Sequence, residues 1–447
     1  MFHMKLKNLF TSENIGKFLW LAFLTSMFFS VRKVFDTPEA TLLGEYSDFT
    51  SLSLYLSDLI LLVLLVHGLI TRWFTWNISL VTKIGTGVIL ILFLSQIGNI
   101  NPLFVFKTLK FLELLLIFEL VRQYFTKYPD FIKEFTKFFI ILCLAQVAIA
   151  FFQISLDRSI GLKLIGEPLL NLDSYGVAKF ASRGILELRA YGTFPHPNVL
   201  SGFLLVGTLI SLTAISLLNK AKFKILACLV TLALGTGMYL TYSKAAIIGL
   251  FIGIFTIFIY SLLNKILLSP LYKRFFSLLP LILVVLMTFW PFFTPRGGTE
   301  SESFAYRNIY NHVGWNIIKE NPIFGVGVGQ SMLHMERLSP RDLQSWEIQP
   351  IHNYYLLSAA DGGAILALAL TTLFLYIFYR LSSSTWNMEQ SPKPHHVVGL
   401  AILLGFLALM HFDHYFYTIQ QTQFFLWLIL GLIMSFVDKS TAKTEIN

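Results

Sequence analysis

The chain has 447 residues, of which 55% are hydrophobic and 13% charged, with a mean hydropathy of +0.67. So few charges cannot cover the surface of a soluble protein of this size. Apolar runs of about twenty residues, the length that a helix needs to cross about 30 Å of hydrocarbon, recur along the whole sequence. The formal net charge of +9 would suggest nucleic-acid binding in a soluble protein, but here membrane topology accounts for it. The composition therefore predicts an all-α integral membrane protein that does not bind nucleic acid.

The first apolar run, Ile15 to Val31, is too long for the hydrophobic region of a cleavable signal peptide. It ends on Arg32 and Lys33 rather than on the small residues of a cleavage site. We therefore expect it to remain as the first membrane span. The two cysteines, Cys143 and Cys228, lie inside apolar runs, so no disulfide framework is expected.

We predict twelve transmembrane helices, near residues 15–35, 53–71, 82–99, 102–121, 138–156, 198–218, 223–241, 245–263, 276–293, 353–379, 397–416 and 423–437. The expected regions are then spans one to five within 1–156, a loop at 157–197, spans six to nine within 198–293, a large loop at 294–352, spans ten to twelve within 353–437, and a tail at 438–447. We find no internal repeat and no soluble domain.

Lysine and arginine decide the orientation, because short cytoplasmic loops are enriched in them. With the N-terminus inside, inner connections such as 220–224 are basic, whereas the short outer connections Gly98–Pro102 and His411–Gln423 carry no lysine or arginine. This pattern predicts a bacterial inner-membrane protein with both termini in the cytoplasm. The cations that run against it are Arg32, Lys33 and Lys244.

Two expected outer loops, Leu156–Pro197 and Thr294–His352, are too long to be simple connections, and long loops on a rigid scaffold usually carry function. Within the second loop, Ser303–Asn321 has helical spacing and Pro322 ends it. We expect a helix that lies on the membrane surface or caps a cavity. Its rough apolar stripe consists of Phe304, Ile309, Val313 and Ile317.

Two polar segments lie at the ends of the expected sixth to eighth spans. Arg189 and His196 lie where the first long loop meets a span, and Arg189 is either an anion-binding residue or a surface arginine. Asn198 either caps the following helix or contacts a ligand. Lys244 ends the Thr241-Tyr242-Ser243-Lys244 turn at the tip of a helical hairpin, where it either binds an anion or snorkels to the lipid headgroups.

The second long loop contributes the other candidates. Arg307 on the loop helix has the planar fork that suits bidentate contact with phosphate. The glycines of 325–329 lack the strand and the flanking residues of a nucleotide-binding loop, so we interpret this segment as packing against a helix. His352, at the membrane entry, is a candidate general base, although a lone histidine there is more often structural. Asp361 lies nine residues after His352, on roughly the opposite side of a straight helix, so it should not orient His352 directly.

Two further groups stay open. His411-Phe412-Asp413-His414 resembles a metal-ligand cluster but matches no zinc signature. The expected fourth span carries charges, which are functional candidates by default inside a membrane, although Lys110 and Glu113 also have the spacing of a structural pair. These charged residues are Lys107, Lys110, Glu113 and Glu119.

Taken in order, the motifs resemble those of the O-antigen ligase and polymerase family. The matching features are a G-T-F-x-x-P-N stretch, a T-x-S-[RK]-A turn, an arginine in a loop helix, a P-x-x-G-x-G segment, and H-N-x-x-L followed by an acidic residue and glycine. In this sequence they are Gly192–Asn198, Thr241–Ala245, Arg307, Pro322–Gly327, and His352–Leu356 with Asp361 and Gly362. The resemblance covers roughly Leu186 to Gly363, and the N-terminal third matches only in hydropathy.

The resemblance implies a GT-C-like glycosyltransferase that moves a glycan from a polyprenyl-diphosphate donor to a glycan or glycolipid acceptor at the outer face, with inversion and without metal or other cofactor. His352 would be catalytic, while Arg189, Lys244 and Arg307 would bind the diphosphate. The possible accessory residues are His196, Asn198, Asn353 and Asp361. Lys244 departs from the family's common arginine, and Asp361 from its usual glutamate.

Three functions remain open at this point. A ligase and an O-antigen or exopolysaccharide polymerase share the motifs, but the paired R-x10-G pattern described for some polymerases is absent. A lipid-linked oligosaccharide flippase would also be polytopic and basic, and the charges of the fourth span fit a transporter. The large outer loops favour the enzyme.

The topology is testable by thiol labelling. With Cys143 and Cys228 removed, single cysteines at Ser174 and Ser339 should both react with an impermeant thiol reagent in intact spheroplasts, because both loops are expected on the outer face. Labelling of only one site would contradict the twelve-span arrangement. A cysteine at Lys222, on an expected inner connection, is the matched control and should stay unlabelled.

Overall fold

A computed structural model describes residues 11–174, 176–182, 185–265, 302–385 and 393–444. Its long helices are α2 (Ser12–Met27), α3 (Leu56–Ile70), α4 (Leu80–Ser95), α5 (Pro102–Lys127), α6 (Ile132–Leu156), α7 (Pro197–Leu217), α8 (Ala221–Leu240), α9 (Lys244–Lys265), α12 (Glu302–Glu320), α14 (Tyr354–Thr385), α15 (Pro394–Leu409) and α17 (Gln420–Thr444). The short helices include α13 (Met335–Leu338) and α16 (Tyr415–Thr418).

The described strands form three small antiparallel pairs. β1 (Arg32–Phe35) pairs with β4 (Leu52–Tyr55), and β2 (Thr41–Leu42) pairs with β3 (Glu45–Tyr46). β5 (Lys179–Ser182) pairs with β6 (Ile185–Leu188) within the first long loop. These hairpins were not expected from the hydropathy pattern, because each strand is short and lies in a connection.

The all-α membrane fold is confirmed: each expected span within the described residues coincides with a helix. Among the described residues, six helices are long and apolar enough to cross a membrane, and α3, α4 and α15 are shorter apolar helices. The expected ninth span, 276–293, lies outside the described residues.

Three expected boundaries were wrong. The first helix ends at Met27 rather than near residue 35, because Arg32 to Phe35 pair as a strand with β4. The eleventh expected span ends at Leu409, and a short connection with α16 follows it. The last helix, α17, continues to Thr444, past the expected end of the twelfth span at residue 437.

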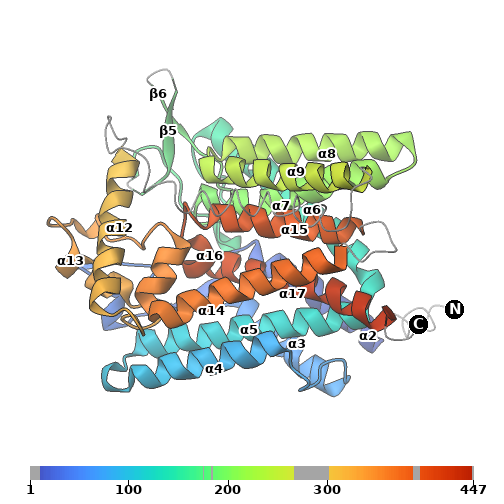
Figure 1. Cartoon of the computed structure of the whole chain (residues 1–447). Coiled ribbons are helices and arrows are strands. Elements are labelled where there is room, and N and C mark those ends of the chain that lie inside the picture. The colour runs from blue at the N-terminus through green and yellow to red at the C-terminus, as the bar shows by residue number, and fades with distance from the viewer. Residues whose placement is uncertain (1–10, 175, 183–184, 266–301, 386–392, 445–447) are drawn as a thin grey trace.

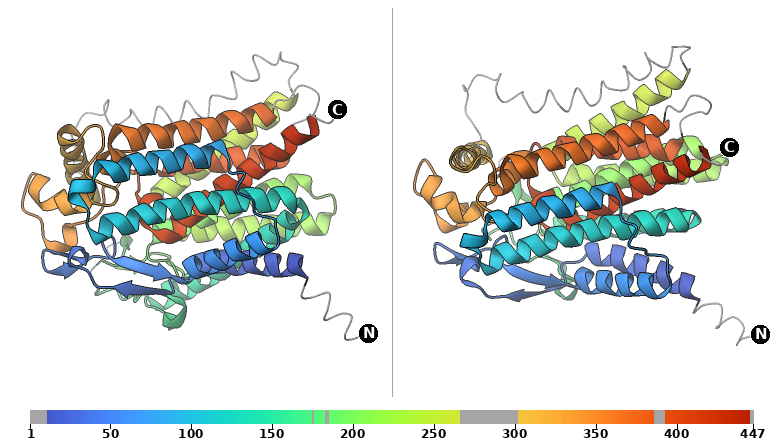
Figure 2. Two further views of the ribbon diagram at one scale, coloured as in Figure 1. Left: turned by 90° about the horizontal axis from the view of Figure 1, so that it is seen from below. Right: turned by 60° about the horizontal axis from the view of Figure 1, so that its bottom comes forward.

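The long helices run side by side as a bundle, and the loop elements gather at one end (Figure 1). Helix α12 lies across that end, and the β5–β6 pair projects from it. The start of α2 and the last turn of α17 lie at the opposite end, as the views of Figure 2 also show. The bundle therefore places the connection between α2 and α3, both long loops and the α15–α17 connection on one side.

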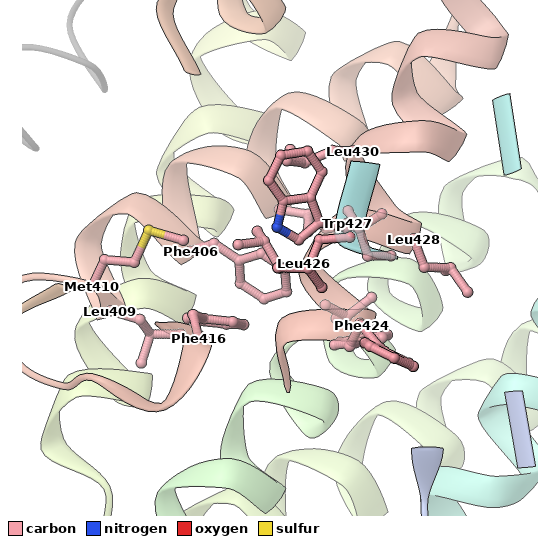
Figure 3. Close-up of a cluster of buried hydrophobic side chains, with 14 of the residues drawn as sticks. Phe406, Leu409, Met410, Phe416, Phe424, Leu426, Trp427, Leu428 and Leu430 are labelled. Atoms are coloured by element: carbon pink, nitrogen blue, oxygen red, sulfur yellow. The ribbon is translucent and has the colours of Figure 1, made fainter. Parts of the chain in front are cut away.

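Helix α17 forms the centre of the bundle. It is apolar nearly all round, and 94% of its most apolar stretch is buried inside the protein, so other helices rather than lipid surround it. It packs along α5 and against α14, while α15 packs along α9. Figure 3 shows its side chains, among them Phe424, Leu426 and Leu430, beside Phe406 of α15. The ring of Phe425 stacks on Phe203 of α7 with centroids 4.1 Å apart.

The charges of the expected fourth span are largely paired within the fold. Lys110 Nζ lies 2.7 Å from Asp58 of α3 and 2.9 Å from Glu113, which confirms the expected pair three residues apart. Glu119 pairs with Arg122, whose guanidinium also reaches Asp438 of α17 at 2.7 Å. These contacts join α5 to its neighbours.

The glycine-rich segment after α12 packs on a break in α14. The N–H groups of Val326 and Gly327 donate to the carbonyls of Ala360 and Asp361, at 3.1 and 2.9 Å. Gly363 has φ 61° and ψ −161°, which interrupts the helix there, and a Cβ at this position would lie 2.2 Å from the Ile323 carbonyl oxygen. The interpretation of this segment as packing against a helix is therefore confirmed.

Candidate functional site

A cavity of about 830 Å³ lies at the end of the bundle that carries the long loops. Its walls come from segments far apart in the sequence, namely residues between Ser30 and Tyr55, Gly166 and Gly176, Arg189 and Val199, Tyr306 and His352, and Asp413 and Gln421. Arg189, His196, Asn198, Arg307 and His352 all line it. The structure thus brings together five of the residues singled out from the sequence.

Arg189 is held on two sides. Its Nε donates to the carbonyl oxygen of Thr241 at 2.7 Å, and its Nη2 donates to Asn198 Oδ1 at 2.8 Å. Asn198 in turn donates through Nδ2 to Asp413 Oδ2 at 2.6 Å. Burial lowers the pKa of Arg189, but an arginine so lowered still carries its charge at neutral pH. The result is a fixed cation on the cavity wall.

Arg307 faces the same cavity from α12. Its Nε is buried and has no hydrogen-bond partner within the described residues, and the same part of the chain offers it no ion pair. A buried donor without a partner is costly, so an anion in the cavity would relieve that cost. Arg307 also lowers the pKa of the neighbouring Arg189 and His352, although burial is the larger cause for both.

His352 lies on the wall with one ring nitrogen engaged. Its Nδ1 is 2.8 Å from the carbonyl oxygen of Pro350, which only accepts, so Nδ1 is assigned the proton. In the neutral ring Nε2 then carries the free lone pair. The ring stacks on Tyr310, with centroids 5.1 Å apart, and meets His414 edge to face at 4.7 Å. Burial lowers the pKa of His352, which keeps the ring neutral at pH 7.

Lys244 does not join the other cations. It is exposed at the start of α9 and is absent from the cavity wall. The turn before it reaches the site through the Thr241 carbonyl oxygen, which accepts from Arg189. Of the three cations expected to converge, Arg189 and Arg307 line the cavity, and the turn of Lys244 contacts the site through its backbone.

The accessory candidates have mainly structural contacts. His196, rather than Asn198, caps α7: its Nδ1 accepts from the N–H of Asn198 at 3.1 Å. Asn353 accepts from the N–H of Leu356 at 2.9 Å at the start of α14 and donates to the His411 carbonyl at 3.1 Å. Asp361 lies outside the cavity, where its carboxylate binds the loop packed on α14.

The cavity residues that were not identified from the sequence as members of the site include the titratable side chains of Arg32, Asp413 and His414. Arg32 forms an ion pair with Asp48 at 2.7 Å. The sequence offered one signal for it, since Arg32 is a cation in an expected outer connection, where lysine and arginine are otherwise scarce. His414 Nδ1 lies 2.6 Å from Thr418 Oγ1. Burial lowers the pKa of His414 to about 3, and His414 and His352 hold the pKa of Asp413 below its ordinary value despite burial.

The side chains of the His411–His414 segment make other contacts. His411 Nδ1 bonds to the Leu407 carbonyl at 2.8 Å, whereas Asp413 binds Asn198. Within the described ranges, no group of three or more histidine, cysteine, aspartate or glutamate side chains is arranged to hold a metal ion.

The fold and the site define a multi-pass helical membrane protein with a cationic cavity at one end of its bundle. Residues 227–371 match the family model described as O-antigen ligase, which supports membership of the O-antigen ligase and polymerase family of glycosyltransferase-like enzymes. The match contains Arg307 and His352, whereas Arg189 and Asn198 lie before it and reach the site through the fold. No curated protein matches the chain.

The buried histidines make stability depend on pH. A histidine titrates near pH 6.5 in an unfolded chain, while burial lowers the pKa of His196 to about 4 and that of His414 to about 3. Between these pKa values the unfolded chain binds more protons than the folded chain does. The free energy of unfolding should therefore fall as pH decreases from 6.5 towards 4, and each histidine contributes up to roughly 1.4 kcal/mol for each pH unit.

The measurement is the thermal midpoint of the purified protein from pH 7.5 to 4.5. His414→Gln should flatten the dependence, whereas the control His312→Gln, at an exposed position of α12, should leave it unchanged. A midpoint that stays constant between pH 7 and 5 would contradict the burial of neutral histidines.

Proposed function

We propose that this protein transfers a glycan from a polyprenyl-diphosphate donor to an acceptor hydroxyl at the outer face of the bacterial inner membrane, in the manner of an O-antigen ligase. The observation that carries the proposal is His352, whose Nδ1 is engaged by the Pro350 carbonyl. Its Nε2 is thereby left as a base in the same cavity as the cations Arg189 and Arg307.

The donor class follows from the setting. No nucleotide sugar or ATP is supplied outside the cytoplasmic membrane, so an outward-facing transferase needs a donor that is activated within the lipid. A polyprenyl diphosphate meets this need and places its charge at the level of the headgroups. Arg189 and Arg307 supply two fixed positive charges for it, and the unpartnered Nε of Arg307 is a donor without a competing partner in the described chain.

The reaction is an inverting displacement. The acceptor oxygen attacks the anomeric carbon of the donor sugar while the bond from that carbon to the diphosphate oxygen breaks. The proton of the acceptor hydroxyl passes to His352 Nε2, and the polyprenyl diphosphate leaves with the electron pair of the broken bond. Arg189 and Arg307 stabilise the charge that develops on the leaving oxygens. The step requires no electron transfer.

The walls of the cavity suit a carbohydrate. Tyr306, Tyr310 and Trp346 offer aromatic faces from the second long loop, and Tyr415 offers another from α16. Polar groups such as Asn198 and Gln421 lie among them, which is the mixture of apolar surface and placed polar groups typical of ligand sites. A volume of about 830 Å³ accommodates several sugar units.

The first test removes the cation of α12, Arg307. Arg307→Ala should lower transfer by about 10²–10³, the loss found when one donor to a developing oxyanion is removed. Lys244→Ala is the matched control, since it also removes a cation but at an exposed position outside the cavity, and it should stay within about twofold of the unchanged protein. The assay is transfer of radiolabelled glycan from purified donor lipid. Equal losses in the two variants would refute the assignment.

The base is tested separately. His352→Ala should abolish transfer while donor lipid still binds, and His352→Gln, which keeps hydrogen-bonding reach without basicity, should be equally inactive. Because burial and Arg307 lower the pKa of His352, the ring stays neutral at pH 7 and kcat should begin to fall only below the pKa of an ordinary histidine, about 6.5. Near-normal turnover by His352→Gln would show that the residue only positions a substrate.

A further inference from the structure

The segment that follows α6 folds back along the helix instead of extending away from it. The carboxylate of Glu167 accepts from Gln153 Nε2 at 2.8 Å, and Gln153 lies in the last turn of α6. The two ends of the segment are tied to each other, because the N–H of Ser159 donates to the Leu170 carbonyl at 3.2 Å and Ser159 Oγ accepts from the N–H of Leu170 at 2.7 Å. Residues 159–170, which we call the return loop, therefore lie beside the end of the helix.

The return loop is held in one shape from its inner side. Glu167 is buried, and its carboxylate also accepts from the N–H groups of Ile160 and Leu162, at 2.7 and 2.5 Å. Gly166 has a φ of 87°, and a Cβ there would lie 2.5 Å from the backbone nitrogen of Ser30, so the loop packs directly on the chain that follows α2. A loop fixed in this way loses little conformational entropy when its outer face binds a partner.

The outer face of the return loop presents two uncovered leucines. Leu164 is 95% exposed and Leu169 is 85% exposed, which are the largest exposed fractions of any large hydrophobic residue in the described part of the chain. The end of α6 is apolar on its exposed side too, where Phe152 and Leu156 lie. Only 28% of the apolar stretch of α6 is buried inside the protein, and in a helix that crosses a membrane the remaining surface faces lipid. The two leucines therefore lie beside a lipid-facing surface.

The charges of the return loop do not oppose contact with lipid. Its only charged residues are Lys163 and Glu167. Glu167 is buried beneath the loop, so the outer face presents no carboxylate, and a lysine beside an inserted leucine can extend its ammonium group to the headgroups. On the inner side of the loop, Gly166 and Pro168 line the cavity. The loop is therefore a single layer of chain between the cavity and whatever covers the leucines.

We propose that Leu164 and Leu169 insert into the lipid leaflet at this end of the bundle and anchor the cavity wall to the membrane surface. Lipid is the partner that fits, because the return loop lies beside the last turn of α6, whose own exposed surface is apolar and faces lipid. The fixed shape of the loop lets both leucines enter with little ordering cost. The proposal concerns the loop and the bilayer alone, so it is tested independently of the glycan transfer proposed above.

Fluorescent probes at the two leucines test the insertion. In the full chain with Cys143 and Cys228 replaced, Leu164→Cys and Leu169→Cys are each labelled with an environment-sensitive NBD dye and placed in lipid nanodiscs that hold one chain each. Lipids that carry a nitroxide near the carboxyl end of the acyl chain should quench both probes. Aqueous iodide should quench them several-fold less than it quenches a probe in water, and their emission should shift to shorter wavelength, because the dye leaves water.

Two labelled reference positions calibrate the result. Asp173→Cys, exposed just beyond the return loop, is the aqueous reference and should be quenched by iodide but not by the lipid. Phe152→Cys, exposed on α6, is the lipid reference and should respond in the opposite way. A probe at either leucine that behaves like the aqueous reference overturns the proposal. Shielding from both quenchers also overturns it, because it would show that protein rather than lipid covers the leucines. The thermal midpoint of each labelled chain checks that it is folded.

Discussion

Arg189 joins three parts of the chain that are far apart in the sequence. Its guanidinium donates to the Thr241 carbonyl and to Asn198, and Asn198 donates onward to Asp413 in the connection before α17. The hairpin of α8 and α9, the start of α7 and the α15–α17 connection are therefore tied at one point. Since these segments form much of the cavity wall, the site keeps its shape only while this cation stays paired to neutral acceptors.

Neutral acceptors matter for the charge of the site. A carboxylate bound directly to Arg189 would cancel its charge. The acceptors that orient its guanidinium are instead the Asn198 amide and a backbone carbonyl, which are neutral and leave the positive charge in place. Asp413 lies one residue further out, where it also faces His352 and His414. Asp413 itself lines the cavity, and the Asn198 amide lies between its carboxylate and the Arg189 guanidinium.

The sequence predicted most helices, because apolar runs of membrane length leave few alternatives. It also singled out Arg189, Arg307 and His352, which the structure places around one cavity, although each also had a structural or surface interpretation in the sequence. It could not place the side chain of Lys244, because the direction of a side chain at a helix start depends on the backbone of the turn, where Tyr242 has a φ of 50°. Pairs such as Asn198 with Asp413, which are 215 positions apart, depend on helix packing that one sequence does not reveal.

The break in α14 has a mechanical consequence. Pro322 to Gly327 are bonded to the backbone on both sides of Gly363, so the end of α12 and the interrupted turn of α14 form one rigid joint. Arg307 lies on one arm of this joint and His352 on the other, so the joint sets the spacing between these two side chains. Sequence changes in its glycines would then alter the relative position of two cavity residues that none of those glycines touches.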